Sequence, residues 1–342
     1  MTSVKDFRVS EPATSESLGR GRFVFTDAYS VFDWGRMPDP IPEKGASLCT
    51  MGAYNFELLE ANGIATHYRG VVDGGGEVTS LSTVEGAPTE MAIDLTQVPE
   101  LPYEGAKAGY DYTSFHDAGG ENYLIPLEIV FRNRVPVGSS LRKRIMPADI
   151  GLEHESWPEE PIELPEPVVE FSTKYERQDR YLSSEEADRI AGIADIDELE
   201  TVARSVNEVI TERAGERGFL HEDGKIECLY FDGEIRVADV VGTFDENRFA
   251  YGGTQLSKEV IRQWYKRNQP AWVEAVAEAK REVRGRETDD WRGLCDVSPT
   301  TLPDDVIGTV SAMYAAGTNA YTGEKRFDAP GITAALEAVS RL

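Results

Sequence analysis

The stretch that most constrains the fold of this chain runs from His221 to Phe249 and predicts a β-hairpin. Its first half alternates apolar positions 226, 228 and 230 with side chains of the opposite face, as a strand on a sheet surface does. The tight turn Phe231-Asp232-Gly233 follows, and Glu234 to Val240 returns as the second strand. Residues near the start of one strand therefore lie beside residues at the end of the other.

Charged side chains gather at one end of this predicted hairpin. Asp223, Lys225 and Glu227 recur with period two and share one face, and Asp239 ends the second strand in an apolar context. Carboxylates with one lysine at the end of a ribbon suit Mg²⁺ that is bound through carboxylates and substrate phosphates. A solvated polar face on an exposed hairpin would give the same pattern, and the spacing alone does not decide between the two.

The charge balance limits the partners of the chain. Its 342 residues include 61 acidic and 35 basic side chains, which gives a net charge of −26 that is spread along the sequence. Nucleic acid and an anionic membrane surface are disfavoured as partners, because both need basic patches. Any phosphate site must therefore be a local island of arginine and lysine.

The cysteines and the termini indicate the compartment. Cys49, Cys228 and Cys295 are widely spaced and form no CxxC pair, which favours a reducing compartment over a disulfide framework or a zinc site. The N-terminus has no apolar signal region, and no run of 18 apolar residues occurs. We expect a cytoplasmic protein without a membrane span. A homo-oligomer is compatible with the sequence, which does not define the oligomeric state.

A basic island of the required kind follows a predicted buried strand. Leu124 to Phe131 is a continuous apolar run, and five of the next 13 residues, 132–144, are basic. Arg132 or Arg142 offers a guanidinium fork for a phosphate monoester, and the turn at Gly138-Ser139-Ser140 offers N–H and hydroxyl donors. A structural cluster of salt bridges is the alternative explanation.

A second basic stretch lies near the N-terminus. Gly19-Arg20-Gly21-Arg22 precedes an alternating strand, Phe23 to Thr26. A glycine and arginine edge before a strand can lie over phosphates, with backbone N–H groups and guanidinium groups both available. Arg-Gly repeats also occur in simple turns, so this stretch by itself is a weak indication of a phosphate site.

The other elements are predicted from periodicity and helix caps. A helix is expected from Ala46 to Asn62, and Ser183 with Glu186 forms a capping box for a helix at 184–192. Residues 73–122 are expected to contain one strand within long acidic loops, as a surface insertion would. The remaining expectations are strands at 64–72 and 168–173, a linker or surface loop at 145–168, and helices at 196–218, 257–284, 304–316 and 331–342.

Several separated motifs point to one family. Pro126 to Arg144 matches the pattern P-L-E-x-V-x-R-N…G-S-L-x-x-R with one extra serine, and Asp223, Lys225, Glu227 and Asp239 match D-x-K-x-E followed by D-E. Weaker matches occur at residues 19–22, 27–33, 44–45, 63–67, 244–249 and 257–262. Over most of residues 18–265 the chain thus resembles the SAICAR synthetases (phosphoribosylaminoimidazole-succinocarboxamide synthases).

The resemblance implies an ATP-dependent ligase of purine biosynthesis. Such an enzyme joins the carboxylate of CAIR, a phosphoribosyl aminoimidazole carboxylate, to the amine of L-aspartate, and releases SAICAR, ADP and phosphate through an acyl phosphate. Carboxylate attack on the γ-phosphoryl group brings anions together, so catalysis consists of positioning and of neutralisation by Mg²⁺, arginine and lysine. No covalent enzyme nucleophile is needed, in agreement with the absence of a Ser-His-Asp or Cys-His constellation in the sequence.

The resemblance also implies roles for individual residues. Glu227 and Asp239 would hold Mg²⁺ and, with Lys225, form the catalytic set. The residues that bind ATP would be Arg20, Arg22, Glu128, Lys174 and Lys225. The residues that bind substrate would be Arg132, Ser139, Ser140, Asp179, Asp223, Asp245 and Arg248.

Three departures from the family pattern concern this site. Arg20 and Arg22 stand where the family has lysines, and the extra serine leaves the phosphate ligand open between Ser139 and Ser140. Val240 stands where a second carboxylate is usual, which leaves the number of metal ions open. Val240 favours an alternative function, a kinase-like nucleotide-binding phosphotransferase or a homologue without aspartate condensation. A non-catalytic acidic binding protein is a third hypothesis, against which the basic island and the hairpin argue.

The fold that the resemblance implies is mixed α/β, of the α+β class, with two lobes. Residues 1–131 would form a β-rich lobe over ATP, similar to the N-terminal lobe of a protein kinase, with the acidic loop insertion at 73–122. Residues 132–342 would form a larger α+β part that carries the substrate and Mg-ATP residues and the C-terminal helices. The site would lie in the cleft between the two lobes.

The acidic composition generates a first prediction, that the source cytoplasm is rich in salt. We expect the free energy of unfolding to increase with KCl, because salt screens the repulsion within a chain of net charge −26. Denaturation curves recorded at about 0.1 M and about 2 M KCl measure this difference. A transition that is indifferent to salt would contradict the prediction.

Overall fold

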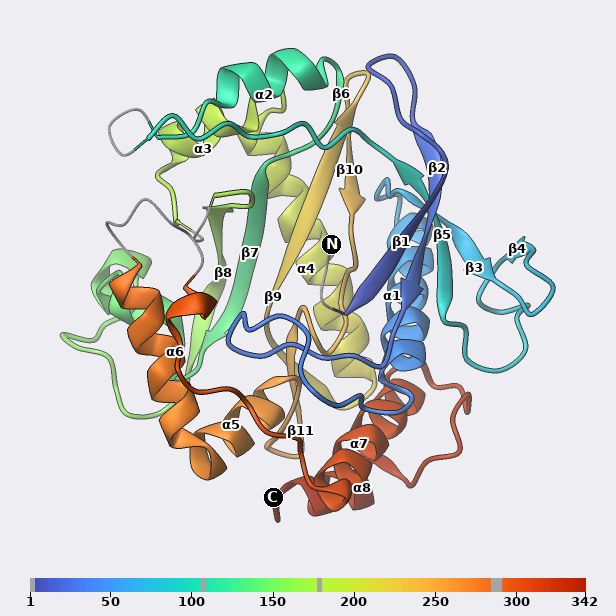
Figure 1. The fold of residues 1–342 in the computed structure, drawn as a ribbon, viewed down its shortest axis with the longest axis vertical. Helices are drawn as coiled ribbons and strands as arrows, with labels where there is room; N and C mark the ends of the chain where they lie inside the picture. The colour runs from blue at the N-terminus through green and yellow to red at the C-terminus, as the bar shows by residue number, and fades with distance from the viewer. Residues whose placement is uncertain (1–3, 106–108, 177–179, 284–290) are drawn as a thin grey trace.

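The computed structural model describes residues 4–105, 109–176, 180–283 and 291–342, which form two antiparallel sheets with helices around them (Figure 1). The smaller sheet has the order β1-β2-β5-β3-β4. Its strands are β1 (Lys5–Glu11), β2 (Gly19–Phe25), β3 (Tyr68–Val72), β4 (Val78–Thr79) and β5 (Glu90–Leu95). The prediction of a mixed α+β fold is confirmed.

The larger sheet has seven strands, and the long strand β9 lies at its centre. Its main order is β12-β11-β9-β7-β8, and β10 and β6 also pair with β9. The strands are β6 (Asn122–Leu124), β7 (Leu127–Val135), β8 (Ile162–Thr173), β9 (Phe219–Phe231), β10 (Glu234–Ala238), β11 (Arg248–Tyr251) and β12 (Thr254–Leu256).

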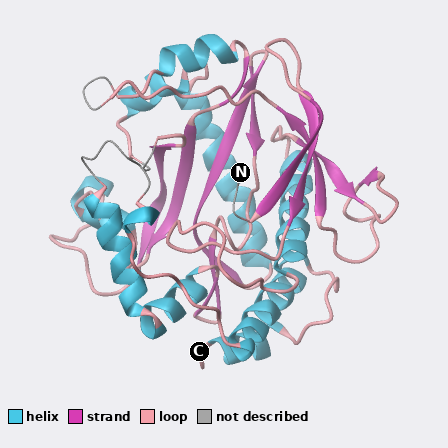
Figure 2. Cartoon of the chain, viewed as in Figure 1, coloured by secondary structure: helices cyan, strands magenta, loops and turns pink. Residues whose placement is uncertain are grey.

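Helices cover the outer faces of both sheets, as Figure 2 shows by colour. Helix α1 packs against the smaller sheet, and α4 packs against β7, β8 and β9 of the larger one. The helices are α1 (Lys44–Ala61), α2 (Tyr112–Gly119), α3 (Ser184–Ala191), α4 (Ile196–Glu216), α5 (Glu259–Asn268), α6 (Pro270–Glu282), α7 (Asp304–Thr322) and α8 (Ile332–Val339). In the part of the chain that is described, none of them is both long and apolar enough to cross a bilayer.

The predicted hairpin is the antiparallel pair β9–β10. Phe231 pairs with Glu234, and Glu227 pairs with Ala238, so Asp239 follows directly beside Glu227. Asp232 and Gly233 both have positive φ, 49° and 84°. This is the conformation that a two-residue turn needs to match the twist of its strands.

The hairpin also joins the two sheets. Just before β3, the His67 N–H donates to the carbonyl of Val237 in β10 at 3.0 Å, and the Val237 N–H donates to Ala65 at 2.9 Å. The His67 ring is buried and bonds the carbonyl oxygen of Asp239 at 3.1 Å, so it connects the two sheets. The smaller sheet is therefore fixed on the strand that ends at Asp239.

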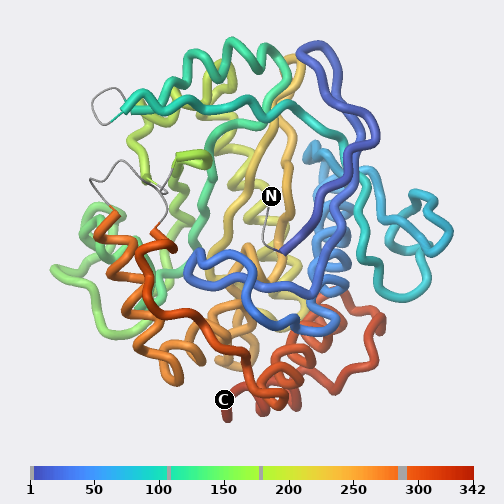
Figure 3. Tube along the Cα trace, viewed as in Figure 1, coloured from blue at the N-terminus to red at the C-terminus, as the bar shows by residue number. Residues whose placement is uncertain are grey.

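Two segments that are far apart in sequence lie side by side in the lower part of the molecule in Figure 3. Residues 26–43, drawn in blue, lie beside residues 291–303. The Leu302 N–H donates to both carboxylate oxygens of Asp39, at 3.2 and 3.3 Å, and Arg292 donates to the carbonyl of Asp33 at 2.6 Å. The C-terminal third of the chain thus holds the loop that follows β2.

Four expectations for secondary structure were wrong in detail. Residues 73–122 contain β4, β5, α2 and the start of β6, and β5 is the middle strand of the smaller sheet. The helix expected at 257–284 is two helices, because Pro270 cannot continue the backbone hydrogen bonds of α5. Strand β8 begins at Ile162, within the expected linker, and β1 occupies a stretch for which no strand was expected.

One glycine of β9 allows the site to form. A Cβ on Gly224 would come within 2.1 Å of the Asn247 Nδ2 and 2.6 Å of the Phe131 ring. The loop that carries residues 245–247 therefore packs directly on the backbone of β9, between Asp223 and Lys225. The larger sheet, this loop and the start of α5 form one wall.

Candidate active site

A cavity of about 400 Å³ opens on this wall. It is bounded by β7, β9, the loop 245–248 and the first turns of α5. The charged residues that line it are Glu128, Arg132, Asp223, Lys225, Asp245, Glu246, Arg248, Lys258, Glu259 and Arg262. Six of the residues that the sequence predicted as site residues are in this set, and Ser140 also lines the cavity.

A pair of carboxylates lies beside the cavity. Glu227 is 4 % exposed and forms an ion pair with Lys174, which follows β8, and Asp239 forms one with Lys5 of β1. Burial and the negative charge of Asp239 raise the pKa of Glu227. Burial alone would raise the pKa of Asp239 as well, but the positive charges of Lys5 and Lys174 outweigh it and lower that pKa.

The lysines near this pair form a connected network. The Lys225 Nζ lies 2.6 Å from Glu128 Oε1 and 3.4 Å from Glu246 Oε2, and the Lys174 Nζ lies 3.4 Å from Glu128 Oε1. Burial by itself would lower the pKa of Lys225, but Glu246 and Glu128 outweigh it and raise that pKa, so the lysine keeps its charge. The ammonium groups of Lys5, Lys174 and Lys225 thus gather near one buried carboxylate, Glu227, and one partly buried carboxylate, Asp239.

An arginine pair occupies the other side of the cavity. Asp223 accepts from the Arg132 Nη1 at 3.2 Å and from the Arg248 Nε at 2.7 Å, so one buried carboxylate aligns two guanidinium groups. Arg132 also donates to Glu170 at 2.8 Å and to the Tyr181 hydroxyl at 3.1 Å. Arg132 and Arg248 line the same cavity, where their remaining N–H groups can meet an anion.

Asp245 is held by two partners from the C-terminal and N-terminal parts of the chain. It accepts from the Lys44 Nζ and from the Tyr314 hydroxyl, each at 2.6 Å. Lys44 is fully buried at the start of α1. Burial would raise the pKa of Asp245, but the ion pair with Lys44 outweighs it and lowers that pKa. Asp245 therefore stays ionised in the wall of the cavity.

The carboxylates present fit a cation that takes most of its ligands from elsewhere. Within the described ranges, no cluster of three or more His, Cys, Asp or Glu side chains has the arrangement of a complete metal site. Mg²⁺ is commonly bound through one or two carboxylates together with substrate phosphates and waters. Glu227 and Asp239 provide two such carboxylates.

Comparisons with known proteins agree on one family. The family model described as SAICAR synthetase matches residues 14–279. A protein of Archaeoglobus fulgidus, provisionally assigned as a phosphoribosylaminoimidazole-succinocarboxamide synthase, is 44 % identical over this whole chain and 98 % of its own length. The chain belongs to the SAICAR synthetase family.

Other relatives and solved structures extend this result. The phosphoribosylaminoimidazole-succinocarboxamide synthase of Thermoplasma acidophilum is 30 % identical over 89 % of this chain and 93 % of its own. The fold matches the Saccharomyces cerevisiae SAICAR synthase complexed with SAICAR, with a TM-score of 0.61 and 21 % identity. The match covers 95 % of this chain and 94 % of the yeast chain. It also matches a SAICAR synthetase in complex with ADP, with a TM-score of 0.54 and 23 % identity. This match covers 88 % of this chain and 99 % of the other.

The reaction of the chain follows from its membership in the SAICAR synthetase family. The protein is a ligase of purine biosynthesis, and it condenses CAIR with L-aspartate in an ATP-dependent reaction.

Several residues expected from the family pattern lie elsewhere. Arg20 forms an ion pair with Asp94 at 2.7 Å, and Arg22 donates to the carbonyl of Gly76 at 3.1 Å. Both arginines alternate along β2 with Phe23 and so point to the face opposite the core. Their placement gives no support to a contact with ATP phosphates. Asp179 lies outside the described residues.

Ser139 and Ser140, between which the phosphate ligand was left open, differ in their surroundings. Ser139 is 2 % exposed, and its hydroxyl accepts from the Leu141 N–H at 3.3 Å, which caps the 3₁₀ helix Ser140–Lys143. Ser140 lines the cavity, and its hydroxyl is 3.5 Å from that of Tyr181. Ser140 is therefore placed to meet a ligand, whereas Ser139 shapes the turn.

Two charged residues of the site were missing from the predicted set. Lys5 is the cation beside Asp239, and Glu246 adds a third carboxylate next to Lys225. The positive charges of Lys225 and Lys258 outweigh the effect of burial and lower the pKa of Glu246. Glu246 could have been found, since it follows Asp245 within a quoted motif. No sequence pattern predicted Lys5, because nothing in the sequence of its strand indicates that this side chain is buried.

Two buried histidines generate a prediction about acid. Burial lowers the pKa of His67 and of His221 to about 4, from an ordinary value near 6.5. Between these values the unfolded chain binds protons that the folded chain does not, so we expect stability to fall as the pH falls from 6.5 to 5. The expected loss is about 2 kcal/mol for each histidine.

Chemical denaturation in high salt, at pH 7 and pH 5, measures this loss while most surface carboxylates stay ionised. His154 is exposed, so the variant His154→Gln should keep the full pH dependence. A free energy of unfolding that is equal at both pH values would contradict the assignment of His67 and His221 as buried neutral side chains.

Proposed function

We propose that the condensation of CAIR with L-aspartate takes place in this cavity, with ATP on the lysine side and CAIR on the arginine side. The observation that carries the proposal is the grouping of the carboxylates of Glu227 and Asp239 with three lysines, directly beside a cavity that Arg132 and Arg248 line. This gathers cations for three anionic substrates in a cavity with five basic and five acidic lining residues, within a chain of net charge −26.

The lysine side suits the polyphosphate of ATP. Glu227 and Asp239 would hold Mg²⁺, which would neutralise phosphate charge during phosphoryl transfer. Lys225, with Lys174 and Lys5, would bind phosphate oxygens and stabilise the charge that moves to the leaving group. Glu128 holds both Lys225 and Lys174 and would orient their ammonium groups.

The arginine side suits a ribonucleotide phosphate. Arg132 and Arg248 are fixed by Asp223, and planar guanidinium groups bind phosphate through paired N–H donors. Ser140 and Tyr181 would add hydroxyl donors from the same wall. Asp223 would then act by holding the arginines, a different role from the direct substrate contact implied by the family pattern. Asp245 would contact CAIR from the loop.

The reaction balances without an enzyme nucleophile. A carboxylate oxygen of CAIR attacks the γ-phosphorus, the bond to the β-phosphate oxygen breaks, and ADP leaves with the electron pair. The neutral amine of L-aspartate, its first proton lost to water, then attacks the acyl carbon, and phosphate leaves. The second amine proton departs with that phosphate.

The valine at position 240 does not by itself favour a different function. Its side chain is buried, and a Cβ on Gly52 of α1 would lie 3.2 Å from its Cγ1, so it packs in the core between the sheets. A carboxylate at 240 with this orientation would be buried there at a high cost. Glu246 supplies a carboxylate near Lys225 instead, and we infer that it compensates.

The compartment is a smaller part of the proposal. Cys49, Cys228 and Cys295 are free thiols, and Cys49 and Cys228 are buried. Free thiols persist in a reducing environment. We infer that the reaction takes place in the cytoplasm.

Product analysis tests the proposed function. We expect ADP release to require CAIR and L-aspartate together, with one SAICAR formed for each ADP. Chromatography of the nucleotides, with each substrate omitted in turn, measures this. ADP release with CAIR alone at the full rate would support a phosphotransferase instead, and a failure to bind nucleotide would support a binding protein.

A single substitution tests the carboxylate pair. Glu227→Gln keeps the shape of the side chain and removes its charge, so we expect turnover to fall by about 100-fold or more while the fold is retained. Initial rates at several Mg²⁺ concentrations, with a thermal unfolding curve as the control for folding, measure both effects. Activity near that of the wild type would remove Glu227 from the metal-binding role.

A further inference from the structure

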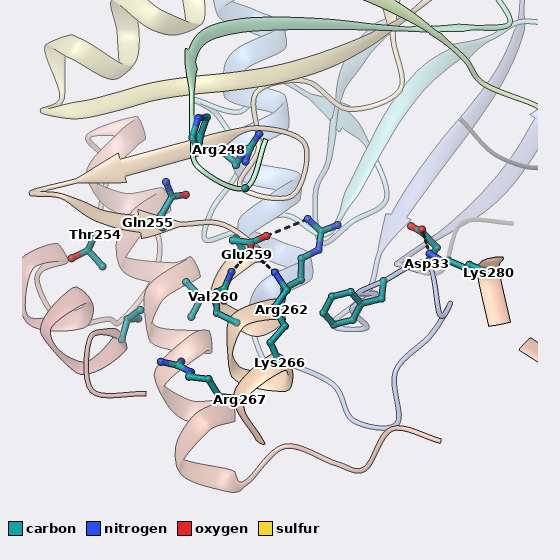
Figure 4. A pocket seen from close by; sticks show the side chains of 15 residues that line it. Asp33, Arg248, Thr254, Gln255, Glu259, Val260, Arg262, Lys266, Arg267 and Lys280 are labelled. Carbon is teal, nitrogen blue, oxygen red and sulfur yellow. Dashed lines mark hydrogen bonds and ion pairs between the residues drawn. The ribbon is translucent and has the colours of Figure 1, made fainter. Parts of the chain in front are cut away.

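The C-terminal helix α7 packs against the loop that carries Asp245, and it lies outside residues 14–279 that the family model matches. No residue of α7, which is described throughout, lines the cavity of about 400 Å³. At this end the lining comes from the loop 245–248 and from α5, whose Glu259 and Arg262 form an ion pair (Figure 4). The helix can therefore affect the substrates only through residues of the loop.

Three positions on one face of α7 contact the segment 241–245, which connects Asp239 to the loop of the cavity. Tyr314, Gly317 and Tyr321 are three and four residues apart, so they share a face of a helix with 3.6 residues per turn. All three are buried. The segment is thus supported along its length by one regular element.

The first of these contacts orients a carboxylate. The Tyr314 hydroxyl donates to the Asp245 Oδ1 at 2.6 Å, and the Lys44 Nζ donates to the Oδ2 at 2.6 Å, so each oxygen has a fixed partner. Burial and the charge of Asp245 raise the pKa of Tyr314, which therefore keeps its proton and remains a donor. Lys44 compensates the charge of Asp245, whereas Tyr314 adds a direction.

The second contact holds the backbone at the start of the segment. The Tyr321 hydroxyl donates to the Asn55 Oδ1 at 2.9 Å, and the Asn55 Nδ2 donates to the Gly242 carbonyl at 2.9 Å. Gly242 has a φ of 68°, and a Cβ there would lie 2.3 Å from the Asn55 Nδ2. The backbone at Gly242 therefore lies directly on the amide that Tyr321 holds.

The third contact depends on a glycine inside the helix. A Cβ on Gly317 would lie 2.8 Å from the Cε2 of Phe244, which is buried beside Asp245 in the sequence. A glycine in the middle of a helix costs about 0.5–1 kcal/mol relative to alanine. The close approach of the Phe244 ring gives a reason for this glycine, because alanine would displace the ring.

We propose that α7 is a positioning element for the ribonucleotide substrate, and that Tyr314 is the positioning residue that orients the carboxylate of Asp245. The inference rests on the proposed function, in which Asp245 contacts CAIR. The carboxylate can accept a hydrogen bond from the amino group of the aminoimidazole, and its two fixed partners set the direction of that bond. A side chain that is oriented in advance has less freedom to lose when the substrate binds.

Tyr314→Phe tests the hydrogen bond to Asp245. It removes one hydroxyl and keeps the ring, so we expect the KM for CAIR to rise about 10-fold, with kcat and the KM for ATP nearly unchanged. Initial rates measure these constants, with the other two substrates at saturation. In an Asp245→Asn background the same substitution should add little, because the hydroxyl acts through the carboxylate. Two effects that are fully additive would overturn the proposal.

Tyr68→Phe is the matched control. The Tyr68 hydroxyl also donates to a carboxylate, that of Glu57 at 3.0 Å, but neither residue is in the lining of the cavity. This variant should lose thermal stability as Tyr314→Phe does, and it should keep the KM for CAIR of the wild type. An unchanged KM for CAIR in Tyr314→Phe, or an equal rise in both variants, would overturn the role of Tyr314.

Gly317→Ala tests the helix without removing a polar group, and it supplies the test if Tyr314→Phe fails to fold. Alanine strengthens the helix, but its Cβ displaces Phe244 and with it Asp245, so the KM for CAIR should again rise. Gly308→Ala, on the same helix with no described atom within 4 Å of the added Cβ, should leave this KM unchanged. A KM for CAIR that is the same in both alanine variants would overturn the role of α7.

The wild type separates the failure of this inference from the failure of the proposed function. If the wild type formed no SAICAR from CAIR, L-aspartate and ATP, the proposed function itself would fail. If the wild type were active and the variants Tyr314→Phe and Gly317→Ala kept all its constants, only the role of α7 would fail.

Discussion

The ion pairs of two neighbouring carboxylates, Glu227 and Asp239, set the main constraint on this structure. Glu227 of β9 is buried and Asp239, which follows β10, is partly buried, and a charge that is withdrawn from water is costly unless a partner neutralises it. The partners come from far away in sequence: Lys174 follows β8 of the larger sheet, and Lys5 lies in β1 of the smaller one. Removal of one partner from a buried pair typically costs about 3–5 kcal/mol. The pair thus helps to fix one sheet on the other.

The same reasoning explains how a strongly acidic chain gathers cations at one site. Its excess carboxylates are mostly on the surface, whereas the cations of the site are held by a few buried acids. Asp223 aligns Arg132 and Arg248, and Glu128 holds two lysines. The charged lining of the cavity is therefore balanced, with five basic and five acidic residues, in a chain whose net charge is −26.

The sequence predicted those parts of the site that local patterns determine. The alternation in β9 and the turn Asp232-Gly233 placed Glu227 beside Asp239, and the basic run after Phe131 placed Arg132 on the cavity. The assignment of Arg20 and Arg22 to ATP stays a prediction without support from their placement, because a glycine and arginine motif does not determine which face of the strand its side chains occupy. The face is decided by tertiary packing, which turns Phe23 inward and both arginines outward.

Lys5 is a residue of the site that no local sequence pattern could predict. Its strand alternates Phe7 and Val9 with polar residues, but both apolar side chains are exposed, so the pattern does not indicate that Lys5 is buried. The lysine is buried because Asp239 requires a cation, and that requirement exists only after both sheets have met. The break between α5 and α6 could have been predicted. Pro270 is present in the sequence, and a proline commonly ends a helix at the residue before it.

Backbone strain shows how far the fold is adapted to this chemistry. Among the described residues, five other than glycine have positive φ: Phe32, Asp33, Glu43, Asp232 and Asp239. Asp232 forms the hairpin turn, Glu43 precedes the buried Lys44 that holds Asp245, and Asp239 is itself one of the paired carboxylates. Phe32 and Asp33 line a cavity of about 630 Å³ along α5. Each such conformation costs about 1–3 kcal/mol and persists where its surroundings enforce it. Asp33 and Asp239 are held by ion pairs with Lys280 and Lys5, so charged contacts also hold two of these backbone conformations in place.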